Sequence, residues 1–179
     1  MTTALLCVDV QADFLPGGSL AVTDGDAVVA PLVAAAGAVD LVVATRDWHP
    51  AGHASFLASG GTWPDHCVIN TSGAELHPAI AGVADRVVDK GSDPARDAHS
   101  GFDGTDLTEW LRSCGVDRLL VGGLATDYCV RATVLDARAA GFAVQVLSDA
   151  VRAVELTSGD GERALREMQA AGATLSAPV

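Results

Sequence analysis

Short segments that are apolar on successive residues constrain the fold of this chain most. A strand with one face in solvent alternates apolar and polar residues, whereas a strand covered on both faces does not. The segments therefore predict buried strands of a parallel sheet between two helix layers. They lie at residues 4–10, 41–45, 86–89, 119–121 and 143–147, with a shorter one at 173–175.

Helix-like segments separate these strands, at residues 26–38, 106–113, 127–140 and 158–171. Three of them end near a glycine, the usual residue just beyond a helix C-terminus. Alternating strands and helices favour right-handed crossovers between parallel strands. We therefore predict an α/β fold, a three-layer Rossmann-like sandwich with a mostly parallel sheet of five to six strands. With 179 residues and no internal repeat, residues 1–179 are expected to form one domain.

Charge and hydropathy exclude several classes of partner. The formal net charge of −12 opposes nucleic-acid phosphates and anionic membranes, so we expect neither. No apolar stretch approaches the ~20 residues of a membrane helix, and the start MTTALLCVDVQADF lacks the basic region of a secretory signal. We expect a soluble, cytoplasmic protein whose four cysteines, without a CxxC pair, stay reduced. Whether it forms a homo-oligomer stays open.

Residues 46–78 stand apart because they lack clear strand or helix periodicity and are rich in Gly, Pro, His, Trp and Asp. Loops this long in a compact domain are usually functional or disordered. Disorder is disfavoured by Trp48, Phe56, Trp63 and the histidines of this segment. We predict an ordered loop that builds a site where open α/β sheets bind ligands, at the carboxyl ends of the strands.

The segment GGLATDYCV places Cys129 between a strand and a helix. Thr126 or Asp127 is expected to cap that helix, which puts Cys129 in its first turn. The positive end of the helix dipole there favours a nucleophilic thiolate, and nearby backbone N–H groups can receive an oxyanion. The alternative is a buried structural cysteine.

Two charged residues lie at the carboxyl ends of strand segments: Asp9 at the end of the first, and Lys90 as the last residue of RVVDK. If the strands lie side by side, Asp9, Lys90 and Cys129 converge. Lys90 would then stabilise a thiolate and an anionic intermediate, and Asp9 could carry protons to a departing amine. In isolation, Asp9 could instead cap a loop and Lys90 could be solvated.

The loop contains Asp47, His49, His53 and His66 within twenty residues. Asp47 and His49 are two apart on extended chain and point to the same side, which suits two ligands of one metal. A mixed carboxylate and imidazole set suits one divalent Zn, Fe or Mn ion better than Ca or Mg.

Aromatic residues lie close in sequence to these candidates. Phe14 and Trp63 could grip a planar aromatic substrate, or could equally pack the loop onto the body. Trp48 and Phe56 are interpreted as packing residues.

Taken in order along residues 4 to 175, these segments resemble the nicotinamidase/pyrazinamidase branch of the isochorismatase-like hydrolases. The motifs that carry the resemblance are CVDVQADF, PGGSLAV, RDWHPAGHASF, WPDHCV, KGSDPARDAHSGFDG, GGLATDYCV and SDAVRAV. Several spaced motifs in one order are more specific than any single motif.

The resemblance implies a role for each matching position. It implies a catalytic triad, an oxyanion hole next to a cis peptide between Leu124 and Ala125, a metal site and a substrate pocket. The chain departs from the family at His99, where many relatives have Tyr, which leaves one pocket wall in doubt. The implied residues are Asp9, Lys90 and Cys129 for the triad; Ala125 and Cys129 for the oxyanion hole; Asp47, His49 and His66, with His53 as a further candidate, for the metal; and Phe14, Leu20, Trp63, Ala125, Tyr128 and His99 for the substrate.

The activity that the resemblance implies is hydrolysis of nicotinamide to nicotinic acid and ammonia through a thioester on Cys129, with pyrazinamide as a further substrate. In such enzymes the metal binds the ring nitrogen of the substrate and carries water when substrate is absent. Two alternatives remain: a related amidohydrolase acting on an N-carbamoyl or ureido compound, and a metallohydrolase with metal-activated water and a structural Cys129. A pure binding module is disfavoured because competent residues fill every triad-like position.

Overall fold

The computed structural model describes residues 2–176 of the chain. Its centre is a six-stranded sheet in the order β3-β2-β1-β4-β5-β6, and the pairings in the described part of the chain are all parallel. This confirms the predicted α/β sandwich at the upper end of the predicted strand number. The strands are β1 (Thr2–Val8), β2 (Leu41–Asp47), β3 (Arg86–Lys90), β4 (Val116–Leu124), β5 (Ala143–Arg152) and β6 (Thr174–Leu175).

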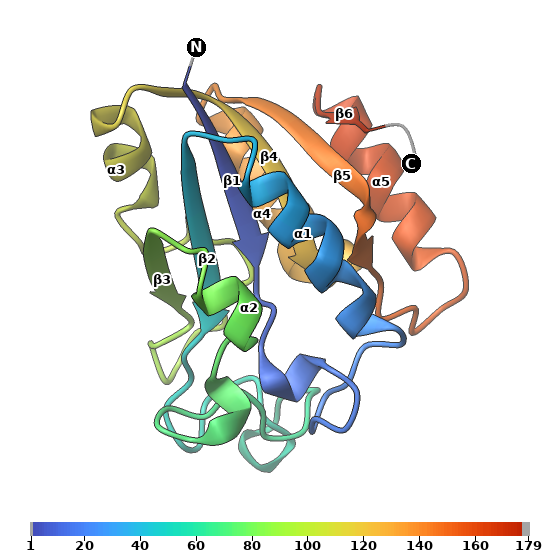
Figure 1. Cartoon of the computed structure of the whole chain (residues 1–179). Helices are drawn as coiled ribbons and strands as arrows, with labels where there is room; N and C mark the ends of the chain where they lie inside the picture. Colours follow the sequence, from blue (N-terminus) through green and yellow to red (C-terminus); the bar gives the residue numbers. More distant parts are fainter. Residues whose placement is uncertain (1, 177–179) are drawn as a thin grey trace.

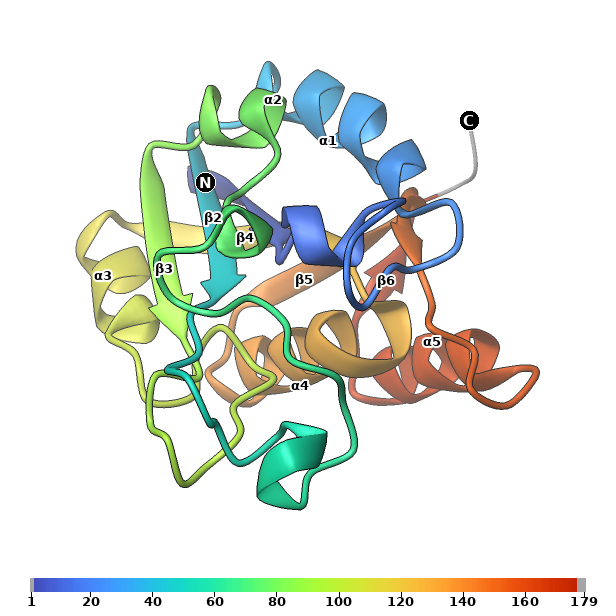
Figure 2. The same ribbon diagram turned by 90° about the horizontal axis from the view of Figure 1, so that it is seen from below.

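Helices cover both faces of the sheet (Figure 1, Figure 2). One face carries α1 (Val29–Ala36) and α2 (Pro78–Ala81). The other face carries α3 (Leu107–Ser113), α4 (Arg131–Ala139) and α5 (Asp160–Ala170). Within residues 2–176, no helix is long and apolar enough to cross a membrane.

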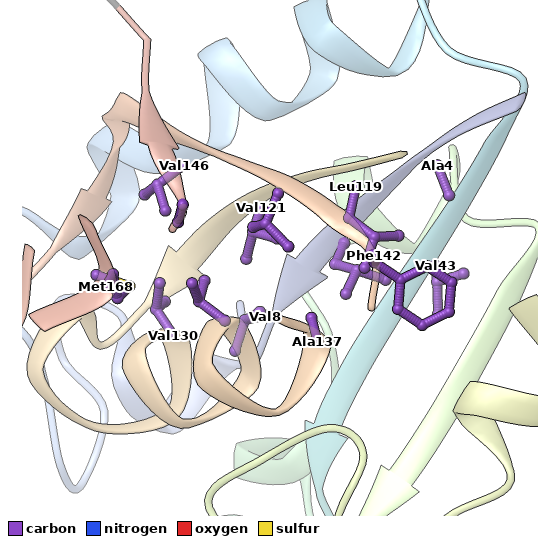
Figure 3. Packing of buried hydrophobic residues seen from close by; sticks show 14 of the residues in the cluster. Ala4, Val8, Val43, Leu119, Val121, Val130, Ala137, Phe142, Val146 and Met168 are labelled. Carbon is purple, nitrogen blue, oxygen red and sulfur yellow. The ribbon is translucent and has the colours of Figure 1, made fainter. Parts of the chain in front are cut away.

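Strand β1 shows why its segment is apolar on successive residues. Ala4, Leu6 and Val8 pack into the core on the side of α3, α4 and α5, whereas Leu5 and Cys7 pack into the core beside α1. All five are fully buried. Figure 3 shows part of the first of these cores, in which side chains of β1, β2, β4 and β5 lie near Val130, Ala137 of α4, Phe142 and Met168 of α5. Both faces of the strand are thus covered, as the sequence pattern predicts.

The carboxyl ends of all strands point to one edge of the sheet, at the bottom of Figure 1. The connection between β2 and α2 covers that edge, and Figure 2 looks directly onto it. This connection is ordered by backbone pairing rather than by long elements. Its backbone bonds include His49 N–H to the carbonyl of Cys67 and Trp63 N–H to the carbonyl of Ser55.

Several element boundaries differ from those predicted. Strand β1 ends at Val8 rather than at residue 10, because Asp9 has a φ of 50° and turns the chain away from the sheet. Strand β4 is longer than predicted at both ends, and β5 is longer at its carboxyl end. The sheet pairing continues there through polar residues and two glycines. The short helix α2 was not predicted, and the segment 26–38 begins as a 3-10 turn, Gly25–Val28, before α1.

Gly123 sets how closely β4 approaches β1 just before the chain reaches Cys129. Its φ is 126°, and a Cβ placed there would lie 2.1 Å from the carbonyl oxygen of Val8. Any side chain at this position therefore forces the two strands apart where Asp9 leaves β1.

We expect Gly123→Ala to lower the free energy of unfolding by about 2–4 kcal/mol, from backbone strain and the clash with β1. Gly141→Ala is the matched control, because Gly141 has a φ of 91° but a Cβ there meets nothing within 4 Å. It should cost only about 1–2 kcal/mol of strain. Urea unfolding of both variants measures the difference, and equal losses would show that the contact with Val8 does not matter.

Candidate active site

The ammonium of Lys90 lies at the centre of the site and is fully buried. Its Nζ is 2.5 Å from Oδ1 of Asp47, 2.9 Å from Oδ2 of Asp9 and 3.5 Å from Sγ of Cys129. Asp47 and Lys90 are register partners on β2 and β3, and Asp9 follows directly on β1. Parallel pairing therefore brings together charges that lie far apart in the sequence.

These charges set one another's protonation. Burial opposes a charge on Lys90, but Asp47 and Asp9 outweigh it and raise the pKa of the ammonium well above its ordinary value. Burial also opposes charge on Asp47, where Lys90 and His49 prevail and hold the pKa of the carboxyl below its usual range. For Asp9, burial and the charge of Asp47 prevail over Lys90 and raise the pKa. Asp9 is thus the carboxyl of this group that most readily takes up a proton.

Cys129 lies on a short π-helical turn, Thr126–Val130, rather than in the first turn of α4. The predicted cap is also wrong, because the turn follows Ala125 without a side-chain cap. The carboxylate of Asp127 is used elsewhere: it accepts the backbone N–H groups of Val154 and Glu155 at 2.9 and 3.0 Å. The peptide between Leu124 and Ala125 is cis, as the resemblance implies.

Burial and the neighbouring carboxylates oppose the thiolate that the helix start was expected to favour. Burial raises the pKa of the Cys129 thiol well above its ordinary value; Lys90 opposes this shift, and the carboxylates Asp9 and Asp47 add to it. The thiol of Cys129 and the carboxyl groups of Asp9 and Asp47 present atoms within 4.8 Å of one another. Burial thus favours the thiol form of Cys129, which lies beside a carboxyl that can take its proton.

Asp47, His49 and His66 form the second part of the site, with donor atoms that all lie within 4.8 Å of one another. All three are buried. Nδ1 of His49 lies 2.8 Å from the carbonyl of Gly91, and Nδ1 of His66 lies 2.8 Å from that of Pro64. These contacts leave Nε2 of each ring for a metal, the usual arrangement around histidine ligands.

The residues fit a divalent metal because the Nε2 atom of His49 is buried without a hydrogen-bond partner among the described residues. Burial of such an atom is costly unless something binds it. Gly91 allows this placement, since a Cβ there would lie 2.5 Å from the His49 ring. His53 stacks on His49 but is outside this trio: its Nδ1 lies 2.8 Å from Oγ of Ser55 and its Nε2 lies 3.2 Å from the carbonyl of Arg96.

An open, largely apolar cavity adjoins Cys129 and the metal-ligand candidates Asp47 and His66. Each of the six residues predicted to bind substrate lines it, and Val22 and Val154 also do, which the sequence analysis missed. Both end quoted motifs, PGGSLAV and SDAVRAV, and that position was their only signal. The lining residues are Phe14, Leu20, Val22, Asp47, Trp63, His66, His99, Ala125, Tyr128, Cys129 and Val154.

Two supporting residues were also missed. The hydroxyl of Thr45 donates to Oδ1 of Asp9 at 2.7 Å. The side chain of Gln11 binds both backbone groups of Asp47, accepting from its N–H and donating to its carbonyl, each at 2.8 Å. The signal for Thr45 was its position as a polar residue at the end of the predicted apolar strand 41–45. The signal for Gln11 was its position directly after the predicted strand 4–10. Phe56 packs edge-on against the histidine rings, as interpreted from the sequence.

A thiol at the wall of an apolar cavity, with a buried ammonium and a buried carboxyl behind it, is the arrangement of a cysteine-dependent hydrolase. Comparison with known proteins agrees with this class. The isochorismatase domain model matches residues 3–177, so the chain belongs to the isochorismatase family, in its nicotinamidase and pyrazinamidase branch.

Three relatives illustrate the similarity. The nicotinamidase of Escherichia coli is 43% identical over 96% of this chain and 93% of its own. The pyrazinamidase of Pyrococcus horikoshii, solved in complex with zinc, is 44% identical with a TM-score of 0.90, over 98% of this chain and 99% of its own. A protein of L. infantum, solved in complex with nicotinate, is 38% identical with a TM-score of 0.92, over 98% of this chain and 92% of its own.

We expect Asp47→Ala and His66→Ala each to reduce metal affinity at least about tenfold, because each removes one of three ligands. His53→Gln is the control and should retain the metal, since both of its ring nitrogens already have protein partners. Elemental analysis of purified variants measures the metal content per chain. Unchanged metal content in both ligand variants would contradict this ligand set.

Proposed function

We propose that the chain is a nicotinamidase that hydrolyses nicotinamide to nicotinic acid and ammonia and also accepts pyrazinamide. One observation carries the proposal: Cys129, paired with Lys90 at 3.5 Å, opens into the same aromatic-lined cavity as the ligand candidates Asp47 and His66. The named activities of the E. coli and P. horikoshii relatives support it. Residues 1–179 act as one domain, and the loop 46–78 supplies the metal ligands and part of the substrate pocket.

In the first half-reaction, the Cys129 thiol passes its proton to Asp9 as Sγ attacks the amide carbon. Asp9 suits this because its raised pKa brings it closer to that of the thiol. Lys90 stabilises the sulfur as it becomes anionic, and the backbone N–H groups of Ala125 and Cys129 receive the oxyanion. Asp9 then protonates the amine and ammonia leaves.

In the second half-reaction, water replaces ammonia at the thioester. Asp9, again a carboxylate, accepts a proton from this water, which attacks the acyl carbon and releases nicotinic acid. The proton returns from Asp9 to Cys129. Lys90 stays charged throughout, since two buried carboxyl groups face it.

We propose that Asp47, His49 and His66 hold a divalent metal, with zinc favoured over iron or manganese. One carboxylate and two imidazoles suit zinc with an open position, and the P. horikoshii relative was solved with zinc. When bound, the metal supplies a Lewis-acid anchor for the ring nitrogen of the substrate. Trp63 and Tyr128, with ring centroids 5.1 Å apart, form part of the wall along which the ring lies.

The two alternatives are less well supported. A metallohydrolase with a structural Cys129 would assign no role to Lys90 and Asp9, which are buried near the sulfur. An enzyme for ureido compounds has no need of the metal-ligand trio at the cavity wall.

We expect Cys129→Ala to abolish turnover while the fold and substrate binding remain, because the variant removes only the nucleophile from a turn without a side-chain cap. Ammonia release should fall at least about a thousandfold. Intact mass spectrometry of wild-type protein quenched during turnover should show a nicotinoyl adduct on Cys129. Retention of a tenth of wild-type kcat would exclude the covalent mechanism.

We expect nicotinamide to be a much better substrate than benzamide, although the two rings have similar size and apolar surface. Benzamide has a C–H where nicotinamide has its ring nitrogen, so it loses the anchor at the metal site and aligns poorly with Cys129. Poor alignment alone can cost ~100-fold in rate. The measurement is kcat/KM for nicotinamide, pyrazinamide and benzamide in protein of known metal content. Equal values for nicotinamide and benzamide would exclude anchoring through the ring nitrogen.

A further inference from the structure

His99 lies against the nucleophile in a way that the triad chemistry does not use. Its Nδ1 is 3.9 Å from Sγ of Cys129, and its Nε2 is 3.7 Å from Oδ2 of Asp97. The segment is held in place from the buried side, because Lys90 Nζ donates to the carbonyl of Ala98 at 3.2 Å. Asp97, His99 and Cys129 thus form a row that ends on the reacting sulfur.

The positions of the neighbouring atoms suit one tautomer of the neutral ring. A neutral imidazole has one N–H donor and one acceptor nitrogen. With the N–H on Nε2, it faces the carboxylate of Asp97, and the lone pair of Nδ1 then faces Sγ.

His99 differs from Asp9 in its access to water. Asp9 is fully buried, with Thr45 bound to Oδ1 and Lys90 2.9 Å from Oδ2. The side chain of His99 is 42% exposed at the wall of the cavity. Water that enters the cavity can therefore reach His99 without displacing a buried contact.

We propose that His99 is a further catalytic residue: it is a second base for the hydrolysis of the thioester, and the one proton that leaves the attacking water goes to His99 on this route and to Asp9 on the other. Nδ1 takes a proton from water as its oxygen forms a bond to the acyl carbon. The C–S bond then breaks, the acid leaves and the sulfur departs as thiolate. The imidazolium returns the proton to Sγ across the 3.9 Å contact, so the thiol and the neutral ring are both restored.

This inference rests on the proposed function, and it concerns the second half-reaction only. Acylation uses the proton that Asp9 carries from the thiol to ammonia, and His99 takes no part in it. Loss of His99 should therefore slow the release of the acid without slowing the release of the first ammonia.

The test compares His99→Phe and His99→Gln, which replace the ring by groups that cannot accept a proton. Each variant should lower steady-state kcat for nicotinamide about ten- to a hundredfold. Rapid quench should show an unchanged first turnover of ammonia, and intact mass spectrometry should show accumulated nicotinoyl enzyme. His99→Gln keeps hydrogen-bonding capacity, so full activity in it would overturn a role in proton transfer.

Hydroxylamine provides an independent readout, because it attacks thioesters with less help from a base than water needs. Adding it should restore turnover in the His99 variants by a larger factor than in the wild type, with nicotinohydroxamic acid as product. Asp97→Asn should show a smaller loss of the same kind. Asp103→Asn is the matched control, because Asp103 pairs with Arg96 in the same segment and should leave kcat unchanged.

The outcomes separate the two proposals. Wild-type protein that releases no ammonia from nicotinamide would overturn the proposed function itself. Wild-type activity with unchanged kcat in both His99 variants would overturn the inference alone. An equal fall in the first turnover and in steady state, without rescue by hydroxylamine, would assign His99 to positioning of substrate and would also overturn it.

Discussion

The buried ammonium of Lys90 is the interaction on which the rest of the site depends. It contacts carboxylates from two other strands and lies 3.5 Å from the sulfur of Cys129. A buried charge is tolerated only when it is paired and hydrogen-bonded, and removing one partner from such a group typically costs 3–5 kcal/mol. The three strand ends must therefore stay in register, because a slip of any one of these strands would leave a charge unpaired inside the protein.

Asp47 links the two parts of the site. One of its oxygens pairs with Lys90, and the other lies 3.5 Å from Nε2 of His49 in the metal-ligand trio. The carboxylate is thus shared between the group that activates the nucleophile and the group that would hold the substrate ring. Gln11 fixes its backbone from both sides, so the position of Asp47 does not depend on the metal alone. This sharing places the reacting sulfur and the anchor of the substrate at a fixed separation.

Much of this arrangement could be predicted from the sequence. Segments such as LLCV indicated strands buried on both faces, and alternating helices then required parallel strands with their carboxyl ends at one edge. Asp9 and Lys90 were singled out because both lie at the carboxyl ends of apolar strand segments, and such ends meet at one edge of a parallel sheet. The cavity residues Val22 and Val154 were missed because an apolar residue in a loop has no pattern that separates packing from substrate contact. The π-helical turn was missed because Asp127, a good cap by residue type, binds the backbone of residues 154 and 155 instead.

The sequence by itself determined the fold class, the edge of the sheet that carries the site and the residue types available there, since periodicity and residue chemistry are local properties. Only the tertiary structure decided how these groups act on one another. The raised pKa of the Cys129 thiol follows from burial and from carboxylates on other parts of the chain, and no local pattern reports either. The approach of His99 to Cys129 likewise depends on how the segment after β3 folds back over the strand ends. Distances between residues far apart in the chain set the electrostatics of the site, and only the folded chain fixes those distances.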